Sequence, residues 1–266
     1  MNLPAPGKDQ DAFRVSDGFV AVADGATPLG GEPGSSVRAF ADAALDGLAS
    51  RRDEPAARMV RTAIRAARQH GGHHSPPLSC TLALARTERR RIEFVVLGDC
   101  TAVVEDAEGR RETIRDHRLD RIDGAVVERL AALMGTGMSA EDAELSVKQN
   151  LIDNRMRMNT PDSYWSFSTE PAAAKHVLHR LRDANTVSAV LICSDGFARL
   201  ADTFHAAAGM AGLMKRCRRE GLASLGDELR ALERAPESLA RFPRLNRHDD
   251  ATAILLVSIE DPADRD

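Results

Sequence analysis

Short apolar runs recur along the chain, and each begins or ends beside a turn-forming or acidic residue. They are FVAVA (19–23), SCTLALA (79–85), RIEFVVLG (91–98), VSAVLIC (187–193) and ATAILLVSI (251–259). Runs of this length, bounded by turn residues and rich in Val, Ile and Leu, are typical of β-strands that are buried in a sheet. The segments TAVVED (101–106) and RRETI (110–114) predict further strands.

Segments with helical spacing lie between these strands. Apolar residues recur at helical intervals over 35–48, where Ser35 or Ser36 can cap the helix, and over 54–69. Helices are also predicted over 118–153, 170–183 and about 200–235, with a polar loop over 154–169. Hairpins, then helices, then more strands favour a layered α+β fold over a doubly wound parallel sheet. The chain shows neither an internal repeat nor a dividing linker, so we expect one domain over 1–266 with a polar tail at 260–266.

Composition excludes several classes of function. Of 266 residues, 43% are hydrophobic and the net charge is −4, which indicates a globular protein that does not bind nucleic acid. The sequence contains no apolar run of the roughly 20 residues that a membrane helix needs, and no secretory pattern at its start. The four cysteines form no C-x-x-C pair, which is typical of reduced thiols in the cytoplasm. We therefore expect a cytoplasmic protein that does not associate with membranes.

The tetrapeptide SDGF occurs twice, at 16–19 and 194–197. The first copy lies between AFRV and FVAVA, so Asp17-Gly18 predicts a two-residue hairpin turn in which both residues have positive φ. The second copy follows the apolar run VSAVLIC and precedes ARLADTF, which has helical character. Asp195 is therefore expected where a buried strand emerges.

Other acidic residues occupy the same kind of position. Asp24 and Asp99 each follow an apolar run, whereas Asp249 and its neighbour Asp250 precede the last one. If the last strand runs antiparallel to its neighbours, these carboxylates gather at one edge of a sheet, and Asp11 can join them in front of its own strand. Taken singly, each Asp-Gly is a common turn, so the prediction depends on the whole set.

Four or five carboxylates in one place repel each other unless a cation neutralises them. Hard oxygen ligands favour Mg²⁺ or Mn²⁺ over Zn²⁺. Gly25, directly after Asp24, allows close approach of a carbonyl or a water because it has no side chain. Two such ions about 3.5–4 Å apart can activate water against a bound phosphate. The alternative is a set of unrelated turns and solvated loops.

Six motifs in order carry a resemblance to a known family. The motifs DQDAF, VADGA, SCTLALA, LGDC, ICSDGF and HDDATAILL resemble those of the metal-dependent serine/threonine phosphatases of the protein phosphatase 2C type, from about residue 8 to 258. The small, single-domain bacterial branch is the most similar. The resemblance implies a four-layer αββα sandwich, in which two mainly antiparallel sheets are flanked by helices and a binuclear Mn²⁺/Mg²⁺ centre lies between the sheets.

The resemblance also implies roles for single residues. Asp24 would bridge both ions and Gly25 would contribute its carbonyl, while Asp195 and Asp249 would complete the two sites. Asp24, Asp195 and Asp249 are thus the expected catalytic residues. Asp11 resembles an outer metal ligand. Asp99 resembles the ligand of a weaker third ion. The implied reaction is attack of activated water on phosphoserine or phosphothreonine in a protein substrate by a monomeric enzyme.

The chain departs from the family's pattern at two places. An arginine that grips the phosphate usually precedes the first motif, whereas Lys8 is the nearest cation here and would bind as a point charge. A histidine that some members carry after Asp-Gly is replaced by Ala26. The metal ligands are untouched by these changes, but substrate affinity and rate are affected. The segment 118–165 lies where the family has a variable flap, so we expect substrate choice to be set there.

Two alternatives stay open beside this reading. Cys193 and Arg199 satisfy the C-x5-R spacing of phosphatases that use a cysteine nucleophile. Cys80 and Arg86 have the same spacing across a plain strand, and Asp195 would place a negative charge in the phosphate cradle, so chance explains the match better. The other alternative is a catalytically weak phosphatase-like module that binds and regulates a phosphorylated partner, and the missing arginine supports it.

Overall fold

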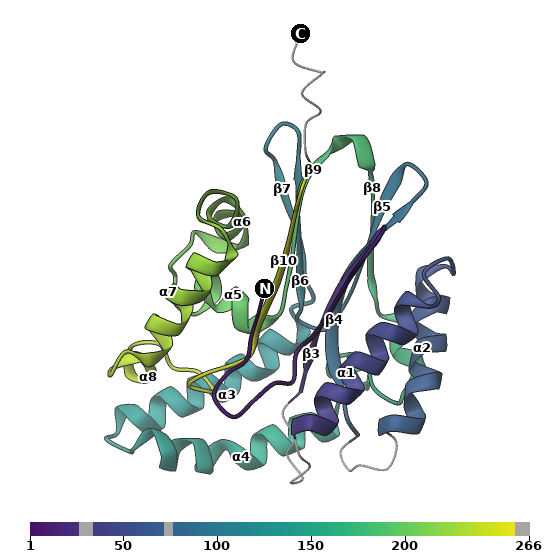
Figure 1. Ribbon diagram of the computed structural model, residues 1–266. Coiled ribbons are helices and arrows are strands. Elements are labelled where there is room, and N and C mark those ends of the chain that lie inside the picture. Colours follow the sequence, from purple (N-terminus) through teal and green to yellow (C-terminus); the bar gives the residue numbers. More distant parts are fainter. Residues whose placement is uncertain (27–33, 72–76, 259–266) are drawn as a thin grey trace.

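The computed structural model describes residues 1–26, 34–71 and 77–258, and Figure 1 shows the chain as a ribbon. The predicted tail at 260–266 and most of the Gly/Pro-rich stretch after Asp24 lie outside the described residues. The strands are β1 (Asn2–Leu3), β2 (Ala12–Ser16), β3 (Phe19–Gly25), β4 (Cys80–Glu88), β5 (Arg91–Leu97), β6 (Thr101–Asp106), β7 (Arg111–Ile114), β8 (Leu178–Asp183), β9 (Val187–Cys193) and β10 (Ala251–Val257).

Two five-stranded sheets face each other (Figure 1). One has the order β1-β10-β9-β6-β7 and the other the order β2-β3-β4-β5-β8, and neighbouring strands pair antiparallel throughout. Apolar side chains from both sheets, such as Val22, Phe94 and Ile192, fill the space between them. This inner core explains why the runs found in the sequence are apolar along their whole length: most of their residues are buried on both faces.

Helices cover the outer faces of the sheets. They are α1 (Gly34–Ala49), α2 (Ala56–Gly71), α3 (Arg118–Gly135), α4 (Ala140–Met156), α5 (Asp195–Asp202), α6 (Gly209–Glu220), α7 (Leu222–Arg234) and α8 (Ser238–Arg241), with short 3-10 helices η1 (Pro171–Lys175) and η2 (Ala184–Thr186). One core cluster joins α1 and α2 to the β2–β8 sheet, and a second joins α5, α6 and α7 to the other sheet. The predicted αββα sandwich is therefore confirmed.

The paired helices α3 and α4 lie across one end of the sandwich (Figure 1). They pack on each other through a small apolar cluster of their own that includes Val126, Leu130 and Val147, with Leu245 against it. The single helical stretch expected over 118–153 is thus two helices with a break after Gly135. Ser139 caps the second, because its hydroxyl accepts the N–H of Asp142.

The two SDGF copies adopt different structures, as expected. The first forms the β2–β3 turn with Ser16 opposite Phe19, but of its two central residues only Gly18 has positive φ. The second copy ends β9, and α5 begins at Asp195. The predicted cap of the first helix also differs from the structure. Helix α1 begins at Gly34, so Ser35 and Ser36 lie inside its first turn and do not cap it.

The helix predicted over 170–183 is wrong. This segment forms the short η1 and then the strand β8, which pairs antiparallel with β5 at the edge of its sheet. An edge strand is half solvated, and β8 is only partly buried, so its sequence lacks the continuous apolar run of the inner strands. Its pairing with β5, about 85 residues away, decides its structure.

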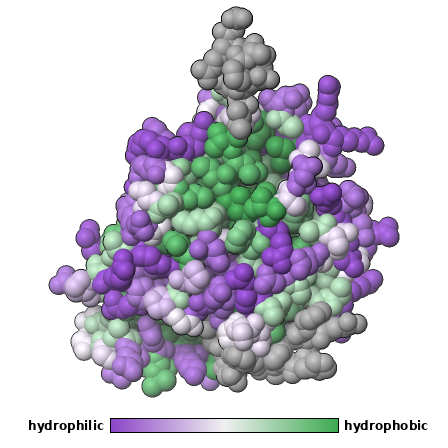
Figure 2. Space-filling view, viewed as in Figure 1, coloured by the Kyte–Doolittle hydropathy of each residue, from purple (hydrophilic) through white to green (hydrophobic). Residues whose placement is uncertain are grey.

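Edge strands also leave part of the inter-sheet core open. Because β1 has only two residues in the ladder, it covers only the start of β10, and Leu256 and Val257 near the end of β10 are exposed, as is Val15 on β2. Figure 2 shows an apolar area on this face, over the upper half of the sandwich. Among the described residues, no helix combines the length and apolar character that crossing a membrane requires.

Candidate active site

Four predicted acidic residues converge at the end of the sandwich next to α3 and α4. Asp24 lies at the end of β3 and Asp99 just after β5, both in one sheet. Asp195 follows β9 and Asp249 precedes β10, both in the other sheet. The antiparallel register of β9 and β10, with Ala253 opposite Cys193, brings the end of one beside the start of the other. The acids therefore meet between two sheets, and not along the edge of one sheet as the strand pattern alone suggested.

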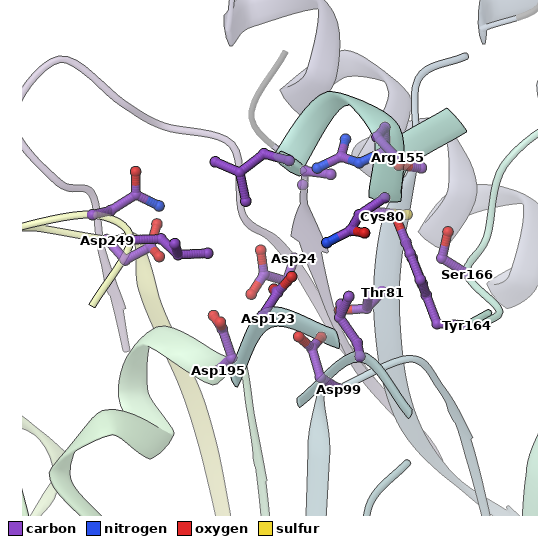
Figure 3. A pocket seen from close by; sticks show the side chains of 18 residues that line it. Asp24, Cys80, Thr81, Asp99, Asp123, Arg155, Tyr164, Ser166, Asp195 and Asp249 are labelled. Atoms are coloured by element: carbon purple, nitrogen blue, oxygen red, sulfur yellow. The ribbon is translucent and has the colours of Figure 1, made fainter. Parts of the chain in front are cut away.

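All four line one cavity of about 190 Å³. The described residues that line it are Asp24, Gly25, Ala26, Ser79, Cys80, Thr81, Asp99, Leu119, Asp123, Leu151, Asn154, Arg155, Tyr164, Ser166, Asp195, Leu245, Asn246 and Asp249. In Figure 3 the carboxylates of Asp24, Asp99, Asp123 and Asp195 point toward a common centre, with Asp249 to one side. The structure thus brings Asp24, Asp99, Asp195 and Asp249 together in one cavity, and their roles as metal ligands stay a prediction.

Burial and mutual repulsion of carboxyls dominate the electrostatics of the cavity. Burial, followed by repulsion from Asp11 and Asp195, holds the pKa of Asp24 well above its usual value. Asp195 is close enough to Asp24 to raise its pKa further, and a proton or a cation between the two carboxyls would relieve their repulsion. Burial and repulsion from Asp195 likewise raise the pKa of Asp99 to about 7.

Asp11 lies behind this cavity and is 1% exposed. No hydrogen bond of ordinary geometry reaches either of its carboxylate oxygens. Burial and repulsion from Asp250 raise its pKa to about 8, and the nearby hydroxyls of Ser194 and Thr252 offset only part of that effect. A buried carboxylate without a partner is costly, and it points to a proton or a cation that the protein atoms do not supply.

The two acids of the HDD motif have different surroundings. Asp250 is buried and accepts the backbone N–H groups of Ala5 (2.7 Å) and Gln10 (2.6 Å), so it fixes the N-terminal segment. Asp249 lines the cavity, and its carboxylate pairs with Arg199 (2.5 Å) and with Lys8 (3.5 Å). The expected phosphate-binding residue Lys8 is therefore placed against Asp249 and is not among the described lining residues.

A buried ionic network supports Asp249 from behind. Glu233 on α7 is fully buried and pairs with Arg230 (2.5 Å), His248 (3.2 Å) and Arg199 (3.5 Å). Arg230 in turn donates to the carbonyl oxygens of Asp249 (2.8 Å) and Leu3 (2.6 Å). These contacts fix the backbone before β10 and the start of the chain in one place.

Gly25 and Gly196 are required by close packing. A Cβ on Gly25 would lie 2.5 Å from the carbonyl oxygen of Gln10 and from a methyl of Val37. A Cβ on Gly196 would lie 1.9 Å from the carbonyl oxygen of Asp250. Real Cβ atoms do not approach backbone this closely, so the glycine in each Asp-Gly pair allows the acid-bearing segments to meet.

The donor chemistry of the site fits a hard divalent cation. Carboxylate oxygens line it, with the backbone of Gly25 beside them, and in the described part of the chain no protein cation pairs with Asp11 or Asp24. As the side chains stand, however, no group of three or more His, Cys, Asp or Glu in the described part of the chain is arranged to hold a metal ion. Arg199 pairs with one carboxylate oxygen of Asp249, so this acid already has a protein cation beside it.

The structure adds two charged residues that the sequence did not single out. Asp123 on α3 and Arg155 on α4 both line the cavity. Burial and repulsion from Asp195 raise the pKa of Asp123 to about 6. Asp123 belongs to an Asp-Gly pair followed by Ala-Val-Val, but this pair lies inside a helix and not at the end of a strand. Arg155 lies in no motif. The packing of α3 and α4 against the sandwich is what brings both to the cavity. Tyr164, 5% exposed, lines the same cavity.

The cysteine-nucleophile alternative finds no support in the geometry. Cys193 is completely buried within β9 and is not among the described residues lining the cavity. Burial raises the pKa of its thiol, which disfavours the thiolate form. Arg199, the other half of the C-x5-R match, is paired with Asp249 and Glu233.

Comparisons with known proteins agree with this fold. The family model described as protein phosphatase 2C matches residues 5–127. A crystal structure of a bacterial serine phosphatase superposes with a TM-score of 0.57 at 17% identity, covering 98% of this chain and 97% of that chain. The serine/threonine phosphatase Stp1 from Staphylococcus aureus has a TM-score of 0.56 at 16% identity, covering 98% and 94%.

The catalytic domain of the phosphatase PstP, solved in complex with two manganese ions, has a TM-score of 0.55 at 15% identity, covering 96% of this chain and 94% of that chain. No curated protein matches the chain by sequence. The family model and the shared fold confirm the resemblance to the protein phosphatase 2C family that the six motifs predicted.

Proposed function

Because the chain resembles the protein phosphatase 2C family in sequence over residues 5–127 and in fold over nearly its whole length, we propose that it is a metal-dependent phosphatase. Its substrates would be phosphoserine and phosphothreonine residues of proteins, attacked by water activated at a binuclear Mn²⁺ or Mg²⁺ centre. One observation carries the proposal: Asp24, Asp99, Asp195 and Asp249, from two different sheets, line one cavity.

The residues have distinct roles in this proposal. Asp24 would bridge two ions. The Gly25 carbonyl, Asp195 and Asp249 would complete their ligands, and Asp11 would be an outer metal ligand. Asp99 would hold a weaker third ion. Such ions lower the pKa of water and offset the charge of a phosphate when they are bound. Holding a cation would require Asp249 to give up its contact with Arg199, and the buried network behind Asp249 fixes its backbone.

The segment 118–165 is proposed to select the substrate. Its helices α3 and α4 supply Leu119, Asp123, Leu151, Asn154 and Arg155 to the cavity wall. These side chains line the same cavity as the four acids of the sheets. A protein substrate would therefore contact this segment when its phosphate enters.

Hydrolysis of p-nitrophenyl phosphate and of a phosphothreonine peptide tests the function. With Mn²⁺ or Mg²⁺ we expect turnover by the wild-type chain and a loss of at least about 10²-fold in Asp24→Asn and Asp195→Asn, because each removes a charge from the centre of the acid cluster. Asp9→Asn is the matched control, since Asp9 is an exposed aspartate paired with Arg38. Turnover that persists without divalent ions, or in both variants, would contradict the proposal.

A second candidate is the phosphatase-like module that binds a phosphorylated partner without efficient turnover. The ion pair between Arg199 and Asp249 favours it, because a guanidinium at that carboxylate competes with a metal ion. Binding of the phosphothreonine peptide without hydrolysis, under saturating Mn²⁺, would support the module.

We also propose that the protein acts as a cytoplasmic monomer and binds neither nucleic acid nor membranes. The net charge of −4 and the absence of C-x-x-C pairs in the sequence support this. Sedimentation of the purified chain tests the oligomeric state.

A further inference from the structure

The cavity poses an electrostatic problem for its proposed substrate. Five aspartates line it, and a phosphate monoester carries up to two negative charges near neutral pH. Bound divalent ions would offset the charge on the side of the sheets. A cation from the protein is needed on the side of α3 and α4, because Asp123 on α3 adds to the negative charge there.

Three other protein cations near the site are already paired with carboxylates. Lys8 pairs with Asp249, and Arg199 pairs with both Asp249 and Glu233. Arg115, at the neighbouring surface, pairs with Asp120 (2.8 Å) and with Asp202. An anion would have to break these pairs before it could bind any of the three residues.

Arg155 differs from them in both position and pairing. Of the described residues that line the cavity, it is the one cation. In the described part of the chain no carboxylate lies within ion-pair distance of its guanidinium, although Asp123 is near enough for Arg155 to lower its pKa. Figure 3 shows Arg155 on the helix above the acid cluster, beside Tyr164.

The surroundings of Arg155 also favour its positive charge. Arg155 lies in the last turn of α4, where a positive charge is favoured by the helix dipole. Burial raises the pKa of the Tyr164 hydroxyl, and the nearby charge of Arg155 offsets part of that effect, so the guanidinium lies close to this 5% exposed side chain. A guanidinium without a paired carboxylate has N–H groups available for a planar, two-point contact with a phosphate.

We propose that Arg155 binds the phosphate group of the substrate. It would take over the role of the arginine that is missing before the first motif of this sequence. This inference rests on the proposed function. The substrate is then a phosphate monoester held between the acid-lined end of the sheets and the α3–α4 pair. Phosphate affinity would thereby depend on the position of the 118–165 segment.

Steady-state kinetics of Arg155→Met and Arg155→Lys test the inference. With the phosphothreonine peptide and Mn²⁺, we expect Arg155→Met to lower kcat/KM on the order of 10- to 100-fold, because a charge-assisted hydrogen bond is lost, mainly through a higher KM. Arg155→Lys should recover part of the loss, since a lysine restores the charge but not the two-point contact. Arg157→Met is the matched control, two residues away and exposed.

Binding measurements separate this inference from the proposed function. By calorimetry with inorganic phosphate and Mn²⁺, Arg155→Met should bind phosphate at least about 10-fold more weakly than the wild type, with unchanged Mn²⁺ affinity and melting temperature. That result supports the role of Arg155 even if the wild type hydrolyses nothing, which would refute only the phosphatase. Unchanged KM and phosphate affinity in Arg155→Met, or no phosphate binding by the wild type, would overturn the inference.

Discussion

Glu233 lies at the centre of the buried ionic network, so a substitution there should disturb the network strongly. Its carboxylate is fully buried and contacts Arg230, Arg199 and His248 from three different segments. In Glu233→Ala the guanidiniums of Arg199 and Arg230, whose side chains are 10% and 15% exposed, lose a shared counter-ion. Arg199 keeps its contact with Asp249, so the charge left without a close carboxylate is that of Arg230.

The expected cost follows from this burial. Removing one partner of a buried ion pair typically costs about 3–5 kcal/mol, because a charge stays behind without compensation. Native proteins are stable by only about 5–15 kcal/mol, so the free energy of unfolding would fall by about a fifth or more. For a chain of this size we expect a drop in melting temperature of roughly 6–20 °C. Glu233→Gln, which keeps a hydrogen-bond acceptor, should fall between Glu233→Ala and the wild type.

Urea denaturation followed by circular dichroism measures this free energy, and a surface ion pair provides the control. Glu228 pairs with Arg216 at 2.7 Å, with side chains that are 35% and 21% exposed. Exposed pairs contribute about 0–1 kcal/mol, so Glu228→Ala should change stability little. If Glu233→Ala were destabilised by no more than Glu228→Ala, the reasoning from burial would be refuted.

Three further outcomes are expected. Without divalent ions, stability should fall as pH rises from about 4 to about 8, because the folded state keeps a proton on Asp11 that the unfolded state releases; thermal scans of Asp11→Asn should show a weaker fall. Gly196→Ala should cost several kcal/mol in urea denaturation through its clash with Asp250, whereas Gly124→Ala, in open space on α3, should be neutral or gain about 0.5–1 kcal/mol. Cys193→Ala should retain phosphatase activity, and complete loss in a well-folded variant would revive the cysteine mechanism.

Local pattern was sufficient for most of the fold. The runs FVAVA and VSAVLIC could be assigned as strands because they are buried on both faces, so their apolar character does not depend on which neighbour they meet. The β2–β3 hairpin could also be predicted from the sequence, because a two-residue turn joins residues that are neighbours along the chain. The edge strand β8 could not be predicted in this way, because its pairing with β5 is nonlocal.

For the site, the sequence by itself determined which acids end or precede strands, and Asp24, Asp99, Asp195 and Asp249 follow from that rule. Only the tertiary structure decided that they come from two facing sheets, that Asp249 is paired with Arg199, and that Arg155 enters the same cavity. The physical reason is that the two features depend on different interactions. Strand ends are set by neighbours along the chain, whereas the partner of a charge is set by packing between segments far apart in sequence.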